Sequence, residues 1–115
     1  MKTSIRVITA ATICLAAQNS LAYITFGAPD CGQWLTEKTQ ARRTWLLGFL
    51  SGMNAAHTAS KNFKVDPLDQ LSSGEQAYVW MDNYCKKNPL NDLSAGGIDL
   101  YIELMDREAK AKARK

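Results

Sequence analysis

The sequence predicts a small all-α protein, a four-helix bundle stapled by one disulfide. Three observations predict it. Apolar residues recur at three- and four-residue steps along most of residues 23–115, with no convincing strand and no internal repeat. Two cysteines, Cys31 and Cys85, lie on either side of the longest helical stretch. The domain is also short enough that a covalent link would help to stabilise its core.

An export signal precedes this domain. A positively charged start is followed by an apolar run, Val7–Ala17, and small residues at the two positions read by signal peptidase place the cut between Ala22 and Tyr23. A spanning helix needs about 20 predominantly apolar residues, which the run does not reach. We therefore expect a cleaved signal peptide over residues 1–22 and a periplasmic protein over residues 23–115. An uncleaved membrane anchor is the alternative.

Removal of the signal makes the protein nearly neutral. The full chain has 14 basic and 11 acidic residues, and Lys2 and Arg6 are the charged residues that precede Tyr23. Nucleic-acid binding would need a clustered basic face and a recognisable motif, so the composition argues against it.

Cys31 and Cys85 are predicted to form one structural disulfide. They are the two cysteines that remain after processing, and an even number in an oxidising compartment indicates a bridge. Closing a loop of this length stabilises a fold by about 4 kcal/mol on the chain-entropy argument. The alternative is a metal or redox site, but the chain has no Cys-x-x-Cys pair and His57 is its one histidine. We expect no metal and no cofactor.

The first two helices follow in order. Asp30 and Gln33 have capping-box spacing at the start of a short helix that ends near Lys38. A long helix is predicted from Gln40 to Ser60. Its apolar face consists of two adjacent stripes, one with Trp45, Phe49, Gly52 and Ala56 and one with Leu46, Leu50, Met53 and His57. A face this broad must pack against something.

A loop from Lys61 to Ser73 leads to the third helix. Ser72 and Glu75 have capping-box spacing ahead of it, and Asn88 and Pro89 end it because proline cannot continue the hydrogen-bond ladder. Its apolar positions are Ala77, Trp80, Met81, Tyr84 and Cys85.

The fourth helix is expected to start between Asn91 and Ser94. Gly96 and Gly97 weaken its first turns, because glycine is a poor helix former. Its apolar positions are Ile98, Tyr101, Ile102 and Met105. A basic C-terminal tail follows, which we expect to be frayed.

The second helix carries a candidate helix-contact face formed by Trp45, Gly48, Phe49 and Gly52. The two glycines make a small-residue groove that would let the helix of a partner chain approach closely. The alternative, which the sequence favours, is close packing within the chain, because soluble bundles also use glycine where helices cross.

Polar and charged residues at two other places have a functional and a simpler interpretation. Asp82 and Asn83 would form a binding spot or, more simply, a solvated face. Lys38, Arg42 and Arg43 cluster near a helix start, where the macrodipole disfavours cations. An acidic partner would offset them, and a neighbouring glutamate with ordinary solvation is the simpler explanation.

Three stretches resemble a broad group of small exported bacterial proteins. They are Cys31-Gly32-Gln33-Trp34-Leu35, Trp45-Leu46-Leu47-Gly48-Phe49-Leu50-Ser51-Gly52-Met53-Asn54, and Trp80-Met81-Asp82-Asn83-Tyr84-Cys85 followed by Asn88-Pro89-Leu90. Over most of residues 31–105 the chain looks related to the HdeA-like acid-stress chaperones and to the Tai/Rap immunity proteins that neutralise secreted peptidoglycan amidases. The resemblance implies one cysteine opening the first helix and another closing a later one.

Catalysis is not predicted, because His57 has no evident partner in a nucleophilic or acid–base arrangement. We expect a periplasmic protein that acts by protein–protein contact, as an immunity-like protein or as an accessory of a secretion or conjugation apparatus. The alternative is an HdeA-like chaperone whose fold loosens when acid protonates its carboxylates. A periplasmic protein partner is expected, and self-association into a homodimer is compatible with the sequence.

Overall fold

A computed structural model of the chain describes residues 24–61 and 66–115. This part contains four α-helices and one turn of 3-10 helix: α1 (Cys31–Thr36), α2 (Gln40–Lys61), η1 (Pro67–Gln70), α3 (Gly74–Lys87) and α4 (Leu93–Ala113). The described ranges hold no strand, and a single antiparallel bridge pairs Asp30 with Asp92. The predicted all-α class with four helices is therefore confirmed. The predicted signal peptide, with its cut between Ala22 and Tyr23, lies outside these ranges.

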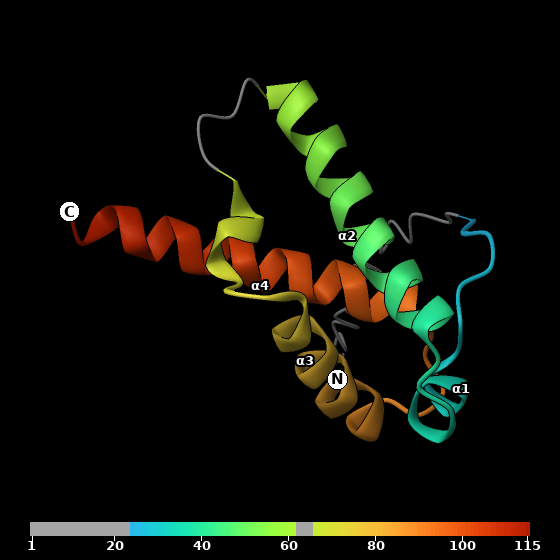
Figure 1. Ribbon diagram of the computed structural model, residues 1–115. Coiled ribbons are helices and arrows are strands. Elements are labelled where there is room, and N and C mark those ends of the chain that lie inside the picture. The colour runs from blue at the N-terminus through green and yellow to red at the C-terminus, as the bar shows by residue number, and fades with distance from the viewer. Residues whose placement is uncertain (1–23, 62–65) are drawn as a thin grey trace, which may run out of the picture.

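The long helix α4 is the element on which the others assemble. It packs against α2, α3 and η1, while α1 packs against α3. Figure 1 shows α2 crossing α4, with the C-terminal ends of the two helices leaving the crossing in different directions. The C-terminal end of α2 therefore extends beyond the point where the two helices cross.

The start of α1 follows the predicted capping box. The backbone N–H of Gln33 donates to Asp30 Oδ1 at 2.7 Å, and the backbone N–H of Asp30 donates to Gln33 Oε1 at 3.1 Å. The segment is also tied to the turn before α4, because the N–H of Cys31 donates to the carbonyl of Asn91 at 2.9 Å. α1 then ends at Thr36.

The capping box predicted for α3, Ser72 with Glu75, is wrong. Ser73 is the N-cap residue, and its side chain makes no capping hydrogen bond. The side chain that reaches back belongs to Gln76 instead of Glu75, and its Oε1 accepts from the N–H of Ser72 at 2.8 Å. The helix is one residue out of register with the predicted box because Gly74 is its first residue.

Helix α4 starts where expected and ends later than expected. Its N-cap is Asp92, whose carboxylate accepts from the N–H of Ala95 at 3.0 Å. The basic tail is helical through Ala113 instead of frayed. Ion pairs at i,i+4 spacing support these turns, such as Asp106 with Lys110 at 2.5 Å.

The core uses one of the two predicted stripes of α2. Buried hydrophobic residues are Cys31, Trp34, Leu46, Leu50, Ala77, Met81, Cys85, Leu93, Leu100, Tyr101 and Leu104. Leu46 and Leu50 thus face the core, whereas Trp45 and Phe49 are half-buried at its edge. In α4 the core face is shifted from the predicted one, and Ile102 is 54 % exposed.

Gly96 and Gly97 lie where helices cross. A Cβ on Gly97 would lie 2.7 Å from Cδ1 of Phe49, and one on Gly96 would lie 2.7 Å from Sδ of Met81. Both residues are buried. They therefore allow α4 to approach α2 and α3 closely, which outweighs their poor helix propensity.

Candidate partner-binding surface on α2

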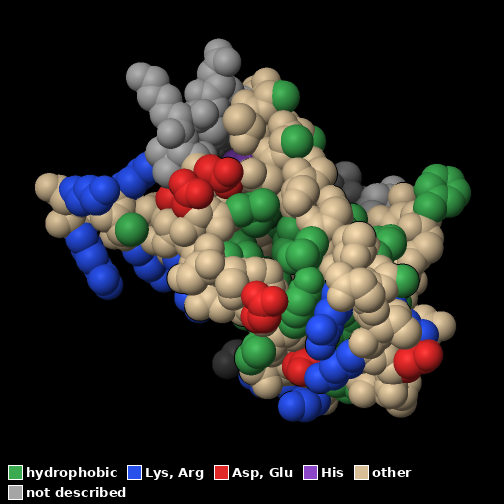
Figure 2. Space-filling model, viewed as in Figure 1, with side chains coloured by type: hydrophobic (Ala, Val, Ile, Leu, Met, Phe, Trp, Pro, Cys, Tyr) green, Lys and Arg blue, Asp and Glu red, His purple; other side chains and the backbone are tan. Residues whose placement is uncertain are grey.

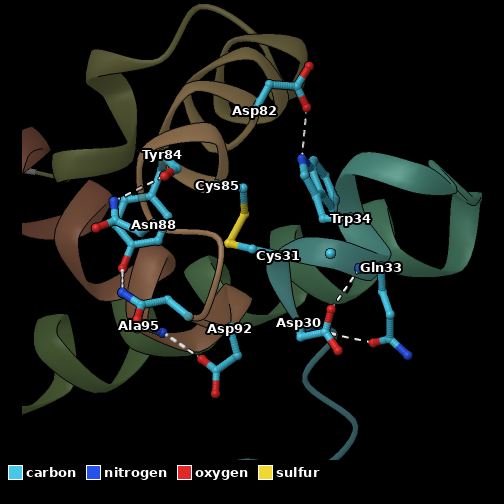
Figure 3. Close-up of a disulfide and its surroundings, with 12 residues drawn as sticks. Asp30, Cys31, Gln33, Trp34, Asp82, Tyr84, Cys85, Asn88, Asp92 and Ala95 are labelled. Atoms are coloured by element: carbon cyan, nitrogen blue, oxygen red, sulfur yellow. Dashed lines mark hydrogen bonds between the residues drawn. A yellow bond between two sulfur atoms is a disulfide. The ribbon is translucent and has the colours of Figure 1, made fainter.

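The disulfide joins the start of α1 to the last turn of α3, as Figure 3 shows. The Cα atoms of Cys31 and Cys85 are 4.9 Å apart, and neither residue is exposed. The predicted bridge is confirmed. Since α2 lies between the two cysteines in the chain, the bridge encloses it in a covalent loop and holds the elements around its N-terminal half in place.

Asp82 does not belong to a solvated face, because it helps the disulfide to hold α1 against α3. Its Oδ1 accepts a hydrogen bond from Nε1 of the fully buried Trp34 at 2.8 Å, and its Oδ2 pairs with Nζ of Lys38 at 2.6 Å. Burial raises the pKa of Asp82, but the hydrogen bonds from Lys38 and Trp34 outweigh it and hold that pKa below its ordinary value. The carboxylate is thus kept charged beside the core.

The two arginines near the start of α2 also have partners within the chain. Arg42 donates to the carbonyl oxygens of Gln33 and Glu37, and its Nη2 lies 3.2 Å from the Glu37 carboxylate. The guanidinium of Arg43 lies over the ring of Tyr78, 5.1 Å from its centroid. These contacts stabilise the helix start, so the two guanidinium groups are offset within the chain and need no acidic partner.

A groove of about 690 Å³ runs along the outer side of the N-terminal half of α2. It is lined by Thr25, Phe26, Gln40, Ala41, Thr44, Trp45, Gly48 and Phe49. The rings of Trp45 and Phe49 stack with centroids 5.1 Å apart and planes 11° apart. Nε1 of Trp45 donates to the carbonyl of Phe26 at 3.0 Å, which fixes the segment before α1 beside the groove. The groove contains three of the four residues of the predicted helix-contact face.

The two glycines of that face lie on the exposed side of α2. A Cβ added to Gly48 or to Gly52 would meet no neighbouring atom within 4 Å. Close packing within the chain, the use that the sequence favoured for them, is therefore wrong for the described residues. The glycines at helix crossings are Gly96 and Gly97, whose only sequence signal was their place inside a helical pattern.

The exposed side of α2 is uncharged over most of its length. No Asp, Glu, Lys or Arg occurs between Arg43 and Lys61. The exposed residues of this stretch are all small: Thr44, Gly48, Ser51, Gly52, Ala55, Ala56, Thr58, Ala59 and Ser60. In Figure 2 the upper part of α2 accordingly shows none of the colours of charged side chains. Surface helices ordinarily place charged residues opposite their apolar face, so this side can be covered without desolvating a charge.

His57 lies on the other side of α2, in a polar network with α4 and η1. Its Nδ1 is 3.0 Å from the hydroxyl of Tyr101, which donates to Oδ1 of Asn54 at 2.8 Å. Nδ2 of Asn54 in turn donates to Oδ1 of Asp66 at 2.8 Å. Burial, and then the charges of Asp66 and Glu108, raise the pKa of Tyr101 above its ordinary value. The network joins three elements away from the groove.

A second groove, of about 460 Å³, lies between α3 and α4. Three of its side chains pair with one another: Nε1 of Trp80 donates to Glu103 at 2.8 Å, and Arg107 donates to the same carboxylate at 2.5 Å. These contacts belong to the packing of α3 on α4, and the α2 groove remains the stronger candidate.

Neither a metal centre nor a membrane span is found in the described part of the chain. Among residues 24–61 and 66–115, no group of three or more His, Cys, Asp or Glu residues could hold a metal ion. None of the helices there has the length and apolar character that a bilayer span requires.

Comparison with known proteins gives no significant match. No family model matches the chain, and neither a curated protein nor a solved structure does. The resemblance to HdeA-like and Tai/Rap proteins therefore stays a prediction from the sequence.

Proposed function

We propose that this protein is exported to the periplasm and acts there by protein–protein contact, with the α2 groove as its binding surface. One observation carries the proposal: an apolar groove with stacked aromatic walls adjoins a helix side that is uncharged and made of small residues. The occupant best suited to it is a helix, because Gly48 and Gly52 are four residues apart on the exposed side of α2, so the small-residue side follows the helix axis.

Covering this surface is favourable for three reasons. Aromatic side chains such as Trp45 and Phe49 supply much of the energy of protein interfaces, and full burial of a large apolar side chain is worth about 1.5 to 3 kcal/mol. The exposed glycines allow close approach of a partner backbone. The hydrogen bond from Nε1 of Trp45 to the carbonyl of Phe26 also holds one side of the groove in place, which reduces the entropy lost on binding.

The partner class follows from the resemblance to Tai/Rap immunity proteins. An immunity-like role, with a secreted cell-wall hydrolase as the partner, agrees with export and with a rigid helical surface. A role as an accessory of a secretion or conjugation apparatus uses the same surface in the same way.

One observation favours the alternative, an acid-stress chaperone. Burial raises the pKa of Asp82 and Asp92, but hydrogen bonds to their carboxylates outweigh it, and for Glu103 the hydrogen bond from Trp80 is the largest cause. The pKa of all three lies below its ordinary value, so acid weakens the contacts of Asp82 and Glu103 between helices and the N-cap that Asp92 forms on α4.

The test is capture of a partner by the processed protein from periplasmic extract. The variant is Gly48→Gln, which fills the groove at a position with free space, and the matched control is Ala109→Gln at an exposed site of α4. We expect the wild type and the control to retain a stoichiometric partner, identified by mass spectrometry, and the Gly48 variant to lose it.

If the Gly48 variant retained the partner as the wild type does, the proposed binding surface would be contradicted. Absence of any partner, together with unchanged toxin sensitivity and conjugal transfer after gene deletion, would contradict the function. The chaperone alternative predicts suppression of client aggregation, measured by light scattering, at about pH 2 to 3, near the carboxyl pKa range.

A further inference from the structure

We infer that Asp66, the N-cap residue of η1, sets the tautomer of His57 on α2 by acting through Asn54 and Tyr101. The four side chains form a hydrogen-bond chain with a single direction, in which every shared proton points toward Asp66. The chain connects α2, α4 and η1 and lies away from the α2 groove, so the inference is independent of the proposed function.

The direction of the chain is fixed at its Asp66 end. A carboxylate can only accept hydrogen bonds. Oδ1 of Asp66 accepts from the backbone N–H of Leu68 and from Nδ2 of Asn54, each at 2.8 Å. The amide of Asn54 must therefore turn its nitrogen toward Asp66 and its oxygen toward Tyr101.

The order then passes to Tyr101 and His57. The amide oxygen of Asn54 can only accept, so the hydroxyl of Tyr101 donates its single proton there, at 2.8 Å. Nδ1 of His57 lies 3.0 Å from the same hydroxyl oxygen, which has no second proton to give. Nδ1 must therefore be the donor. Since a neutral imidazole carries one proton, the neutral ring is in its Nδ1–H form and its lone pair is on Nε2.

The charges that act on Tyr101 agree with this direction. They belong to Asp66 on η1 and Glu108 on α4, which are both carboxylates and cannot donate. Glu108 is itself paired with Lys112 at 3.3 Å. When the ring of His57 takes up a second proton, that proton goes to Nε2 and the bond from Nδ1 to Tyr101 is kept. The chain therefore joins α2 to α4 in both charge states of His57.

The test is the tautomer of His57, read from the ¹⁵N chemical shifts of its two ring nitrogens. His57 is the one histidine of the chain, so its signals need no separation from others. The processed protein is measured at a pH at which these shifts show a neutral ring. We expect the Nδ1–H form to exceed the Nε2–H form by about 5- to 10-fold, the factor that one hydrogen bond provides.

Two substitutions of Asp66 separate the acceptor oxygen from the charge. Asp66→Ala removes the acceptor, so the amide of Asn54 can turn over and the preference for Nδ1–H should be lost. Asp66→Asn keeps an oxygen for both donors and should retain the preference. Asp69→Ala, at an exposed site of η1, is the matched control and should behave as the wild type does.

A substitution of Asn54 provides a second measurement. In Asn54→Ala the hydroxyl of Tyr101 no longer donates to an amide and can donate to Nδ1 of His57 instead. We expect the Nε2–H form to become the dominant one. Circular dichroism confirms that each variant is folded.

A dominant Nε2–H form in the wild type would overturn the inference, as would an unchanged preference in Asp66→Ala or in Asn54→Ala. Equal loss of the preference in Asp66→Ala and Asp66→Asn would overturn it too, because the charge of Asp66 and not the direction of the chain would then set the tautomer.

Discussion

The indole of Trp34 donates a hydrogen bond to the carboxylate of Asp82, 2.8 Å away and 48 residues further along the chain. Trp34 is fully buried in α1 and Asp82 lies on α3, so this bond and the nearby disulfide join the same two helices. Together they fix α1 against α3.

Replacement of Asp82 by alanine is expected to destabilise the fold by about 1 to 3 kcal/mol, because the buried indole N–H of Trp34 loses its acceptor. Lys38→Ala, which removes only the ion pair to the same carboxylate, is expected to cost about 1 kcal/mol or less, since Lys38 is 43 % exposed. Urea denaturation measures both values. Equal losses in the two variants would show that the indole bond contributes nothing of its own.

The same carboxylate makes stability depend on pH. Its pKa is lower in the folded protein than in the unfolded chain, so its contribution is present above about pH 4 and is lost as the pH falls through the folded value. Asp82→Asn cannot take up this proton. We expect its free energy of unfolding to fall less than that of the wild type between about pH 5 and pH 2, measured by denaturant titration at each pH. Parallel losses in both proteins would contradict this assignment.

Loss of the disulfide is expected to destabilise the protein by about 4 kcal/mol, from the loop that it closes. The double variant Cys31→Ala with Cys85→Ala should show this by guanidinium denaturation, and added reductant should not weaken it further. Mass measurement of the exported wild type under non-reducing conditions provides the control. Two free thiols there would contradict the bridge.

Glycine to alanine substitutions should have opposite effects on stability at a helix crossing and on the exposed side of α2. Gly97→Ala forces a Cβ to within 2.7 Å of the Phe49 ring, and overpacking of this kind costs about 1 to 3 kcal/mol. Gly48→Ala meets no neighbour and improves helix propensity, so it should raise stability by up to about 1 kcal/mol. Thermal unfolding of the two variants makes the comparison. A stabilising Gly97→Ala would refute the close approach of α4 to α2.

Removal of the hydroxyl in Tyr101→Phe is expected to cost about 1 kcal/mol, because Asn54 loses its donor and His57 loses a partner. The raised pKa of Tyr101 means that its contribution is complete below about pH 10 and is lost as the pH rises through the folded value. An alkaline titration of tyrosinate absorbance should show one tyrosine ionising late in the wild type. The Phe variant should lack that late step, and its persistence would assign it to another tyrosine.

Local signals in the sequence were sufficient for the helices and the bridge. The N-cap at Asp30 and the helix end at Asn88–Pro89 involve only a few neighbouring residues, so they can be recognised without any knowledge of packing. The two cysteines were also decisive, because a single pairing was open to them. The cap of α3 was misplaced by one residue, since two adjacent serines, Ser72 and Ser73, offer the same chemistry.

By itself, then, the sequence determined the all-α class, the order of the four helices and the disulfide that links α1 to α3. The tertiary structure decided which stripe of α2 is buried, which carboxylate accepts from the buried indole of Trp34 and which glycines lie at a helix crossing. The physical reason is that the burial of a residue depends on which other element packs over its side of the helix. Leu46 and Trp45 are adjacent large apolar residues, yet α4 covers the first and leaves the second beside a groove. Only the packing of distant elements makes that distinction.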